Sequence, residues 1–221
     1  GGHDPYSASK SASEIITDSY ISSFFSEKNT ANIATVRAGN VIGAGDWSSN
    51  RIIPDYFRAK IENKELLIRS PNSVRPWQHV LEPLSGYLEV ASKLFLKEKE
   101  FQGCWNFGPS ELSTSTVLDL INQMKIYDKT VKIKFDNMTS PLESKLLKLD
   151  ISKALSLLDW SPILSFRESI NYTIEGYIFD LTKKNSIENR LSTINSYTET
   201  AASKNIKWAI SNTNKKKNSH K

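Results

Sequence analysis

The alternation of strand-like and helix-like segments is the feature that most constrains the fold of this chain. Short runs of apolar and β-branched residues predict strands at residues 32–41, 65–69, 105–109 and 131–135. Helix signals predict helices at residues 5–28, 54–63, 83–98, 113–125, 152–158 and 165–181. This alternation is typical of the α/β class, although the strands are too few for a complete doubly wound sheet. No glycine-rich dinucleotide-binding loop follows a first strand in the sequence.

The composition narrows the class of protein. Hydrophobic residues make up 38% and charged residues 24% of the 221 positions, as in a soluble globular protein. No apolar run is long enough to cross a bilayer, and no basic-then-apolar start indicates a signal peptide. We therefore expect a cytoplasmic protein with no membrane partner. The single cysteine, Cys104, excludes an internal disulfide framework and gives no metal-ligand cluster, so no metal site is expected.

Residues 183–221 differ in composition from the rest of the chain. They are rich in Asn, Ser, Thr and Lys, and lysines near their end account for much of the net charge of +5. We expect this segment to be a polar, disordered tail. Nucleic-acid binding through the tail rests on charge alone, so no nucleic-acid partner is expected. Unchanged nucleic-acid affinity after removal of the residues beyond Ile210 would confirm this expectation.

Tyr6 and Lys10 form a pair with the geometry of an acid–base site. Asp4 is a good helix N-cap and Pro5 suits the first helical position, so a helix is expected to begin here. Residues four apart lie on one face of a helix, which places the Lys10 ammonium beside the Tyr6 phenol. The cation favours the phenolate that a proton-abstracting tyrosine requires. A solvated surface pair remains the alternative for this spacing.

Three further segments carry side chains suited to an anionic or hydroxylated ligand. The amide of Asn40 can both donate to and accept from hydroxyls or phosphate oxygens. The guanidinium groups of Arg51 and Arg75 can donate paired hydrogen bonds to phosphate. Alternatives remain open, because Asn40 also tolerates an unusual turn conformation and Arg51 also suits a surface salt bridge. These residues lie in the segments RAGNVIG (37–43), NRIIPD (50–55) and SVRPWQHVLEP (73–83).

The segment GGHDPYSASK (1–10) resembles the active-site helix of the extended short-chain dehydrogenase/reductase family, whose nucleotide-sugar members carry Pro-Tyr-x-x-(Ser/Thr)-Lys. The segments around Asn40 and Arg75 are similar to the family motifs Arg-x-x-Asn-Val-x-Gly and Arg-Asp-(Trp/Tyr)-x-(His/Tyr)-Val-x-Asp. The most specific segment, RPWQHVLEPLSG (75–86), resembles one subfamily, the CDP-glucose 4,6-dehydratases. The segment NRIIPD (50–55) resembles Asp-Arg-Ile-x-Pro-Asp of this subfamily, with Asn50 in place of the first Asp. Pro76 stands where the family motif around Arg75 has Asp. The resemblance extends over about residues 1–181.

The resemblance implies a domain organisation. The chain is similar to the C-terminal half of an extended Rossmann-type enzyme, whose dinucleotide-binding half lies upstream of the Tyr-x-x-x-Lys helix. Residues 1–44 and 76–110 are then the remaining part of the Rossmann-type domain. Residues 45–75 and 111–182 form a small α/β domain that binds the nucleotide sugar.

The resemblance also implies roles for individual residues. Tyr6 is the catalytic base at the sugar 4-hydroxyl, and both Tyr6 and Lys10 are catalytic and contact the cofactor. That cofactor is NAD(P)+, with NAD favoured over NADP. His79 is interpreted as structural, because Tyr6 already fills the role of the base. The residues implied to bind substrate are Asn40, Arg51, Arg75 and Glu143, although a solvated loop carboxylate explains Glu143 equally well.

The implied reaction is the dehydration of CDP-D-glucose to CDP-4-dehydro-6-deoxy-D-glucose through transient oxidation at C4. Its pathway would be the synthesis of a cell-surface polysaccharide such as O-antigen. The full-length enzyme is implied to be a homo-oligomer, and apolar residues such as Ile15, Phe24 and Phe25 could serve a helical interface, although core packing explains them equally well.

Two alternatives to this activity stay open. One is another nucleotide-sugar dehydratase or epimerase of the same family, acting on a dTDP-, GDP- or UDP-sugar. The other is a truncated remnant without catalytic activity. We expect these 221 residues alone neither to bind NAD(P)+ tightly nor to turn over. Product formation by the purified chain without an added partner would contradict that expectation.

Overall fold

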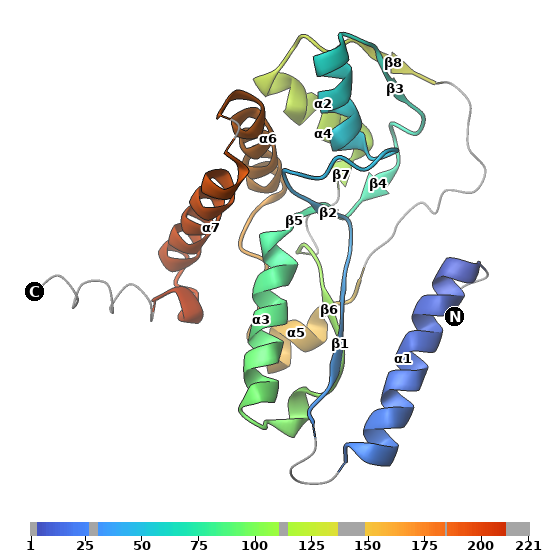
Figure 1. The fold of residues 1–221 in the computed structure, drawn as a ribbon, viewed down its shortest axis with the longest axis vertical. Helices are drawn as coiled ribbons and strands as arrows, with labels where there is room; N and C mark the ends of the chain where they lie inside the picture. The colour runs from blue at the N-terminus through green and yellow to red at the C-terminus, as the bar shows by residue number, and fades with distance from the viewer. Residues whose placement is uncertain (1–3, 27–30, 111–114, 137–148, 184, 211–221) are drawn as a thin grey trace, which may run out of the picture. The chain divides into compact units, whose positions relative to one another are not determined.

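The computed structural model describes residues 4–26, 31–110, 115–136, 149–183 and 185–210 (Figure 1). Helices and strands alternate along these residues, which confirms the α/β class. The chain divides into two compact units. The first unit comprises Gly1–Ala38, Pro83–Gly108 and Leu149–Ser161, and the second comprises Gly39–Glu82, Pro109–Lys148 and Pro162–Lys221.

The first unit is built on two parallel strands. Strand β1 (Ala34–Ala38) pairs with β6 (Gly103–Phe107), from Ala34 opposite Gly103 to Ala38 opposite Phe107. Helices α3 (Leu81–Phe95) and α5 (Ser152–Leu157) and the short helix η1 (Lys99–Phe101) contribute to the core around β6. Parallel strands joined through helices are the expected product of an alternating sequence. The buried side chains of this core are Val90, Phe101, Trp105, Phe107, Ile151, Ala154, Leu158 and Trp160.

Helix α1 (Pro5–Phe24) also belongs to the first unit and begins where the sequence predicts. The Asp4 carboxylate accepts a hydrogen bond from the Ser7 backbone N–H at 3.0 Å, which caps the first turn. Glu14 pairs with Arg37 of β1 at 3.0 Å. No residue of α1 is fully buried, and its apolar side chains Ile15 and Phe24 are mostly exposed.

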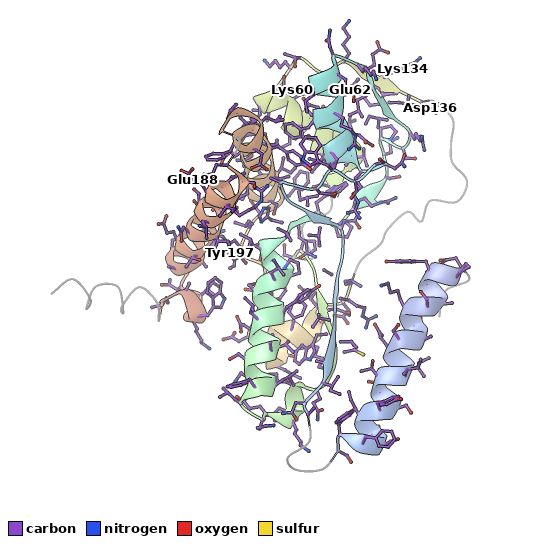
Figure 2. The ribbon with its side chains drawn as sticks, viewed as in Figure 1. Lys60, Glu62, Lys134, Asp136, Glu188 and Tyr197 are labelled. Carbon is purple, nitrogen blue, oxygen red and sulfur yellow. The ribbon has the colours of Figure 1, made fainter. Side chains whose placement is uncertain are left out.

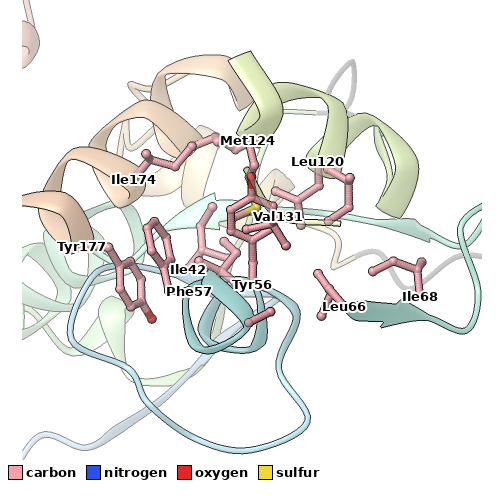
Figure 3. Close-up of a cluster of buried hydrophobic side chains, with 14 of the residues drawn as sticks. Ile42, Tyr56, Phe57, Leu66, Ile68, Leu120, Met124, Val131, Ile174 and Tyr177 are labelled. Atoms are coloured by element: carbon pink, nitrogen blue, oxygen red, sulfur yellow. The ribbon is translucent and has the colours of Figure 1, made fainter. Parts of the chain in front are cut away.

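The second unit has a larger apolar core between α2 (Ile52–Glu62), α4 (Val117–Tyr127) and α6 (Phe166–Lys183). Strand β3 (Leu66–Ile68) pairs in parallel with β8 (Ile133–Phe135) beside this core. Two short pairs complete the unit: β2 (Val41–Ile42) lies parallel to β5 (Gln78–His79), and β4 (Val74–Arg75) lies antiparallel to β7 (Ser115–Thr116). Figure 3 shows the core side chains, with Tyr177 beside Phe57.

The structure differs from expectation at the polar C-terminal segment, where α7 (Ser186–Ser203) is a helix. Tyr197, labelled in Figure 2, lies on α7. It is buried with Ala201, Ile163 and Leu164 in one apolar cluster. The polar composition of residues 183–221 favours disorder, but a few apolar side chains at helical spacing are enough to hold a helix when they find a partner. Residues 211–221, with the lysine cluster, lie outside the described part of the chain.

The boundary between the units also differs from the expected domain boundary. Residues 39–44, 76–82 and 109–110 group with the second unit, whereas the resemblance places them in the Rossmann-type part. Residues 149–161 group with the first unit, whereas the resemblance places them in the sugar-binding domain. The pairing of β2 with β5 explains why residues 39–44 and 76–82 fall in the same unit.

Replacement of Gly86 by alanine is expected to destabilise the first unit. A Cβ at Gly86 of α3 would lie 2.1 Å from Cε1 of the Phe107 ring, which is fully buried. Overpacking of this kind costs about 1–3 kcal/mol, against a gain of up to about 1 kcal/mol in helix propensity. Urea denaturation of Gly86→Ala should therefore give a lower free energy of unfolding than the matched control Ser92→Ala, an exposed site on the same helix. An unchanged or higher value would show that the ring can shift at no cost.

Candidate functional site

A pocket of about 490 Å³ in the second unit brings together three of the four residues expected to bind substrate. Asn40, Arg51 and Arg75 all line it, although they are spread over 36 positions of the sequence. The fourth residue, Glu143, lies outside the described residues. The other lining residues are Gly39, Val41, Ile42, Gly43, Asp46, Asn50, Ile52, Ile53, Pro54, Trp77, Val117 and Tyr177.

Strand pairing explains why Asn40 and Arg75 meet at one pocket. The Gln78 backbone N–H donates to the Asn40 carbonyl at 3.0 Å, and the Val80 N–H donates to the Ile42 carbonyl at 2.8 Å. A Cβ at Gly43 would lie 2.9 Å from Cγ1 of Val80, so only glycine lets these segments approach this closely. Gly43 therefore allows the segment that follows β2 to pack closely against Val80, next to β5.

Arg51 lies at the N-terminal end of α2, which faces the same pocket. It is the N-cap residue, and no side chain caps this helix terminus. The next three residues, Ile52–Pro54, line the pocket with it. The first N–H groups of a helix have no partner within the helix and carry partial positive charge, so this terminus and the guanidinium together favour an anion.

Arg51 also forms the surface ion pair that the sequence left open. Its Nη1 lies 3.5 Å from Oδ2 of Asp46, and its side chain is 61% exposed. Burial alone would raise the pKa of Asp46, but hydrogen bonds from Ser48 and the charges of Arg51 and Arg58 outweigh it and lower that pKa. A guanidinium has five N–H donors, so Arg51 can pair with Asp46 and still donate to a ligand.

The expected catalytic pair lies in the first unit, on α1. The Lys10 ammonium is 5.5 Å from the centroid of the Tyr6 ring, which confirms that the two side chains share one helix face. Both side chains are exposed, Tyr6 by 72%. The pair therefore has the geometry of the predicted site, and its catalytic role stays a prediction.

The structure adds two pocket residues that the sequence motifs did not reveal, Asp46 and Tyr177. Asp46 follows Gly43 and Gly45, and a carboxylate in such a sequence is typical of an ordinary turn. Tyr177 lies on α6 among apolar residues at helical spacing, a pattern that predicts a buried core side chain. Neither carries a local signal, because each reaches the pocket only through the tertiary fold.

His79 is buried beside the pocket strand and does not line the pocket. It is 2% exposed, its Nδ1 accepts the Leu81 N–H at 3.4 Å, and its ring lies edge-on to Tyr172. Burial, aided by the charge of Arg190, lowers the pKa of His79 to about 4. This placement fits the structural role that the sequence analysis gives it.

The buried His79 predicts a pH dependence of stability. The unfolded chain binds a proton near pH 6.5 while the folded chain resists it down to about pH 4. The free energy of unfolding should therefore be fully retained above pH 6.5 and fall by roughly 3 kcal/mol as the pH drops to 4. Urea denaturation across this range should show a shallower slope for His79→Gln, which keeps a polar side chain but does not titrate. Equal slopes for the two proteins would contradict the prediction.

The described residues carry no sign of a metal site or of a membrane-spanning helix. They contain no group of three or more His, Cys, Asp or Glu side chains that could hold a metal ion. None of their helices combines the length and the apolar character needed to span a membrane.

Comparison with known proteins finds a family model and relatives that this chain resembles. Residues 2–100 match the model of the NAD dependent epimerase/dehydratase family. A CDP-glucose 4,6-dehydratase of Salmonella typhimurium is 41% identical over 182 residues, which cover 80% of this chain and 51% of that protein. The chain thus spans about half the length of this relative.

Solved structures agree on the fold. A dTDP-glucose 4,6-dehydratase from Bacillus anthracis in complex with NAD matches with a TM-score of 0.63 at 18% identity, over 83% of this chain and 54% of that one. A UDP-glucuronic acid 4-epimerase from Bacillus cereus in complex with UDP-glucuronic acid and NAD matches with a TM-score of 0.62 at 24% identity, over 80% and 53%. By sequence the chain is similar to the NAD dependent epimerase/dehydratase family, whose model matches residues 2–100, and the solved structures share its fold.

Proposed function

We propose that the pocket of the second unit binds a nucleoside diphosphate sugar. The observation that carries this proposal is the convergence of Asn40, Arg51 and Arg75 on one pocket together with the uncapped N-terminus of α2. Two guanidinium groups and a helix N-terminus suit a diphosphate, and an amide suits sugar hydroxyls. A second pocket of about 390 Å³ shares Asn50, Ile52 and Val117 with the first, which gives room for a ligand larger than a monosaccharide.

We propose CDP-glucose as the ligand and 4,6-dehydration as the reaction of the whole enzyme. The support is the 41% identity to a CDP-glucose 4,6-dehydratase. Isothermal titration of this chain with CDP-, dTDP-, UDP- and GDP-glucose tests the proposal, and CDP-glucose should bind most tightly. Tighter binding of another nucleotide sugar would favour the alternative within the family. Absence of binding by all four would contradict a nucleotide-sugar site.

The proposed chemistry assigns Tyr6 and Lys10 to the reacting end of the substrate. Their exposed side chains on one face of α1 fit a cofactor ribose and a sugar hydroxyl, since the Lys10 ammonium can donate and the Tyr6 hydroxyl can donate or accept. When bound, NAD would supply the hydride acceptor for C4 and, once reduced, the hydride donor for C6. Tyr6 takes the proton of the 4-hydroxyl, and Lys10 would hold the nicotinamide ribose. The 4-ketone acidifies C5, so that water can leave across C5 and C6.

We also propose that the whole enzyme is a homo-oligomer that uses the exposed apolar side chains of α1. Ile15, Ile16, Tyr20 and Phe24 are each more than half exposed. Burial of such apolar side chains against a partner surface lowers the free energy of the assembly. Light scattering after size exclusion should show a smaller species for Ile15→Asp with Phe24→Asp than for the unchanged whole enzyme; equal masses would contradict this role.

A further inference from the structure

The loop between β2 and α2 is held in place by side chains from outside the loop. It runs over residues 43–51 and gives Asp46, Asn50 and Arg51 to the pocket. Gly45 and Asn50 have φ angles of +92° and +61°, both in the left-handed region. A loop with this backbone is not a regular element, so its shape depends on contacts made by the rest of the unit.

Three consecutive carbonyl groups of this loop accept hydrogen bonds from two side chains. The Tyr177 hydroxyl donates to the carbonyl of Asp46. Nη1 of Arg58 donates to the carbonyl of Trp47 at 2.8 Å, and Nη2 donates to that of Ser48 at 3.0 Å. We call Tyr177 and Arg58 the loop clamp. A planar guanidinium with a forked set of donors suits two adjacent carbonyls better than an ammonium does.

Both members of the clamp are themselves fixed. The Tyr177 ring stacks on Phe57 with centroids 4.3 Å apart (Figure 3). It also meets Trp47 edge-on at 5.2 Å. Arg58 pairs with Asp55 one turn earlier on α2. Burial raises the pKa of Tyr177, so its hydroxyl remains a donor at any working pH. The clamp thus connects the cores of α2 and α6 to the loop.

Asp46 connects the loop clamp to Arg51, because it contacts both Tyr177 and Arg51. The carbonyl of Asp46 is held by Tyr177, and its carboxylate accepts the Ser48 N–H at 2.9 Å and pairs with Arg51. If the carbonyl of Asp46 is released, its carboxylate loses a fixed position. Arg51, exposed at the pocket, then samples more rotamers and gives up more entropy when it binds an anion.

We propose that Tyr177 and Arg58 are positioning residues, which hold the loop so that Arg51 is presented to the diphosphate of the ligand. This inference rests on the proposed nucleotide-sugar site and adds two residues that touch the loop backbone instead of the reacting atoms. Tyr177→Phe removes only the hydroxyl and keeps the stacked ring. Arg58→Lys keeps the positive charge but removes the paired guanidinium donors that bind the carbonyls of Trp47 and Ser48.

The test is a double-mutant cycle on ligand affinity. Titration calorimetry of CDP-glucose, and separately of inorganic diphosphate, is run on the unchanged chain, Tyr177→Phe, Arg51→Ala and the double variant. Tyr177→Phe is expected to weaken binding about tenfold, the size of one lost hydrogen bond. In the Arg51→Ala background it should have little further effect, because its action passes through Arg51. A merely structural role would give additive losses.

Tyr172→Phe is the matched control. It removes a phenol hydroxyl from the same helix, where that group lies 3.0 Å from Oγ1 of Thr200. Binding by Tyr172→Phe should equal that of the unchanged chain. Arg58→Lys should show a loss like that of Tyr177→Phe, and hydrogen exchange of the loop amides should be faster in both clamp variants.

The outcomes separate the clamp from the proposed function. Binding by the unchanged chain with no loss in Tyr177→Phe, or with additive losses in the cycle, overturns the clamp and leaves the proposed function standing. Binding of diphosphate without CDP-glucose overturns the nucleotide-sugar proposal, while the cycle on diphosphate still decides the clamp. No binding of either probe overturns both.

Discussion

Replacement of Glu82 by alanine is expected to lower the free energy of unfolding by about 3–5 kcal/mol, the largest stability effect we predict for a single side chain. Glu82 is 1% exposed. Its carboxylate accepts the backbone N–H groups of Ile163, at 3.0 Å, and Leu164, at 2.5 Å, and the Tyr197 hydroxyl at 3.0 Å. Alanine would leave all three buried donors without this acceptor.

The glutamine variant separates hydrogen bonding from charge. Burial raises the pKa of Glu82, although the three donors and the charge of Lys204 oppose this effect, so the ionised form is costly to keep. Glu82→Gln keeps the shape and one acceptor oxygen, and we expect a smaller loss of about 1–3 kcal/mol. Urea denaturation gives both values. Glu175→Ala, which removes an exposed carboxylate from α6, serves as the control and should stay within about 0.5 kcal/mol.

The same variants test how α7 is anchored. Tyr197 connects α7 to Glu82, 115 residues away along the chain. Hydrogen exchange of the amides in α7 should therefore be faster in Glu82→Ala than in the unchanged chain, and the control should not differ. Similar stability of Glu82→Ala and the control would show that the apolar contacts of Tyr197 and Ala201 alone hold this helix.

The sequence predicts local structure well where the signal is local. Asp4 and Pro5 predict the start of α1, and the helix begins there. The sequence predicts that α2 begins at Pro54, whereas the helix begins at Ile52. A proline fits anywhere in the first turn, so it marks that turn without fixing its first residue.

The candidate site was predictable only in part. Asn40, Arg51 and Arg75 come from motifs, and the fold brings them to one pocket. Tyr177, Arg58 and the acceptors of their hydrogen bonds lie in segments distant in sequence; Tyr177 is 131 positions from Asp46. Such contacts arise from the packing of α6 on α2, which no local pattern encodes. Helix α7 was missed for the same reason.

Replacement of Arg75 by alanine is expected to weaken CDP-glucose binding about 100-fold, or by about 2–4 kcal/mol. Arg75 lines the pocket from β4, where its backbone is fixed opposite Ser115 of β7. Its Nη1 donates to the carbonyl of Val74 at 2.9 Å, which orients the guanidinium. A partly buried guanidinium on a strand needs little reorganisation to donate two hydrogen bonds to a diphosphate, so its loss should cost more than that of the exposed Arg51.

The lysine variant distinguishes charge from geometry at this position. Arg75→Lys keeps the positive charge and cannot donate in parallel, so about a tenfold loss is expected. Titration calorimetry of CDP-glucose measures both variants against Arg167→Ala, which removes an exposed arginine of α6 that does not line the pocket. Equal losses for alanine and lysine would mean that the forked geometry carries the whole interaction. Binding by Arg75→Ala equal to that of the control, with its unfolding curve unchanged, would contradict the role of Arg75 and leave Arg51 and the α2 terminus as the anion site.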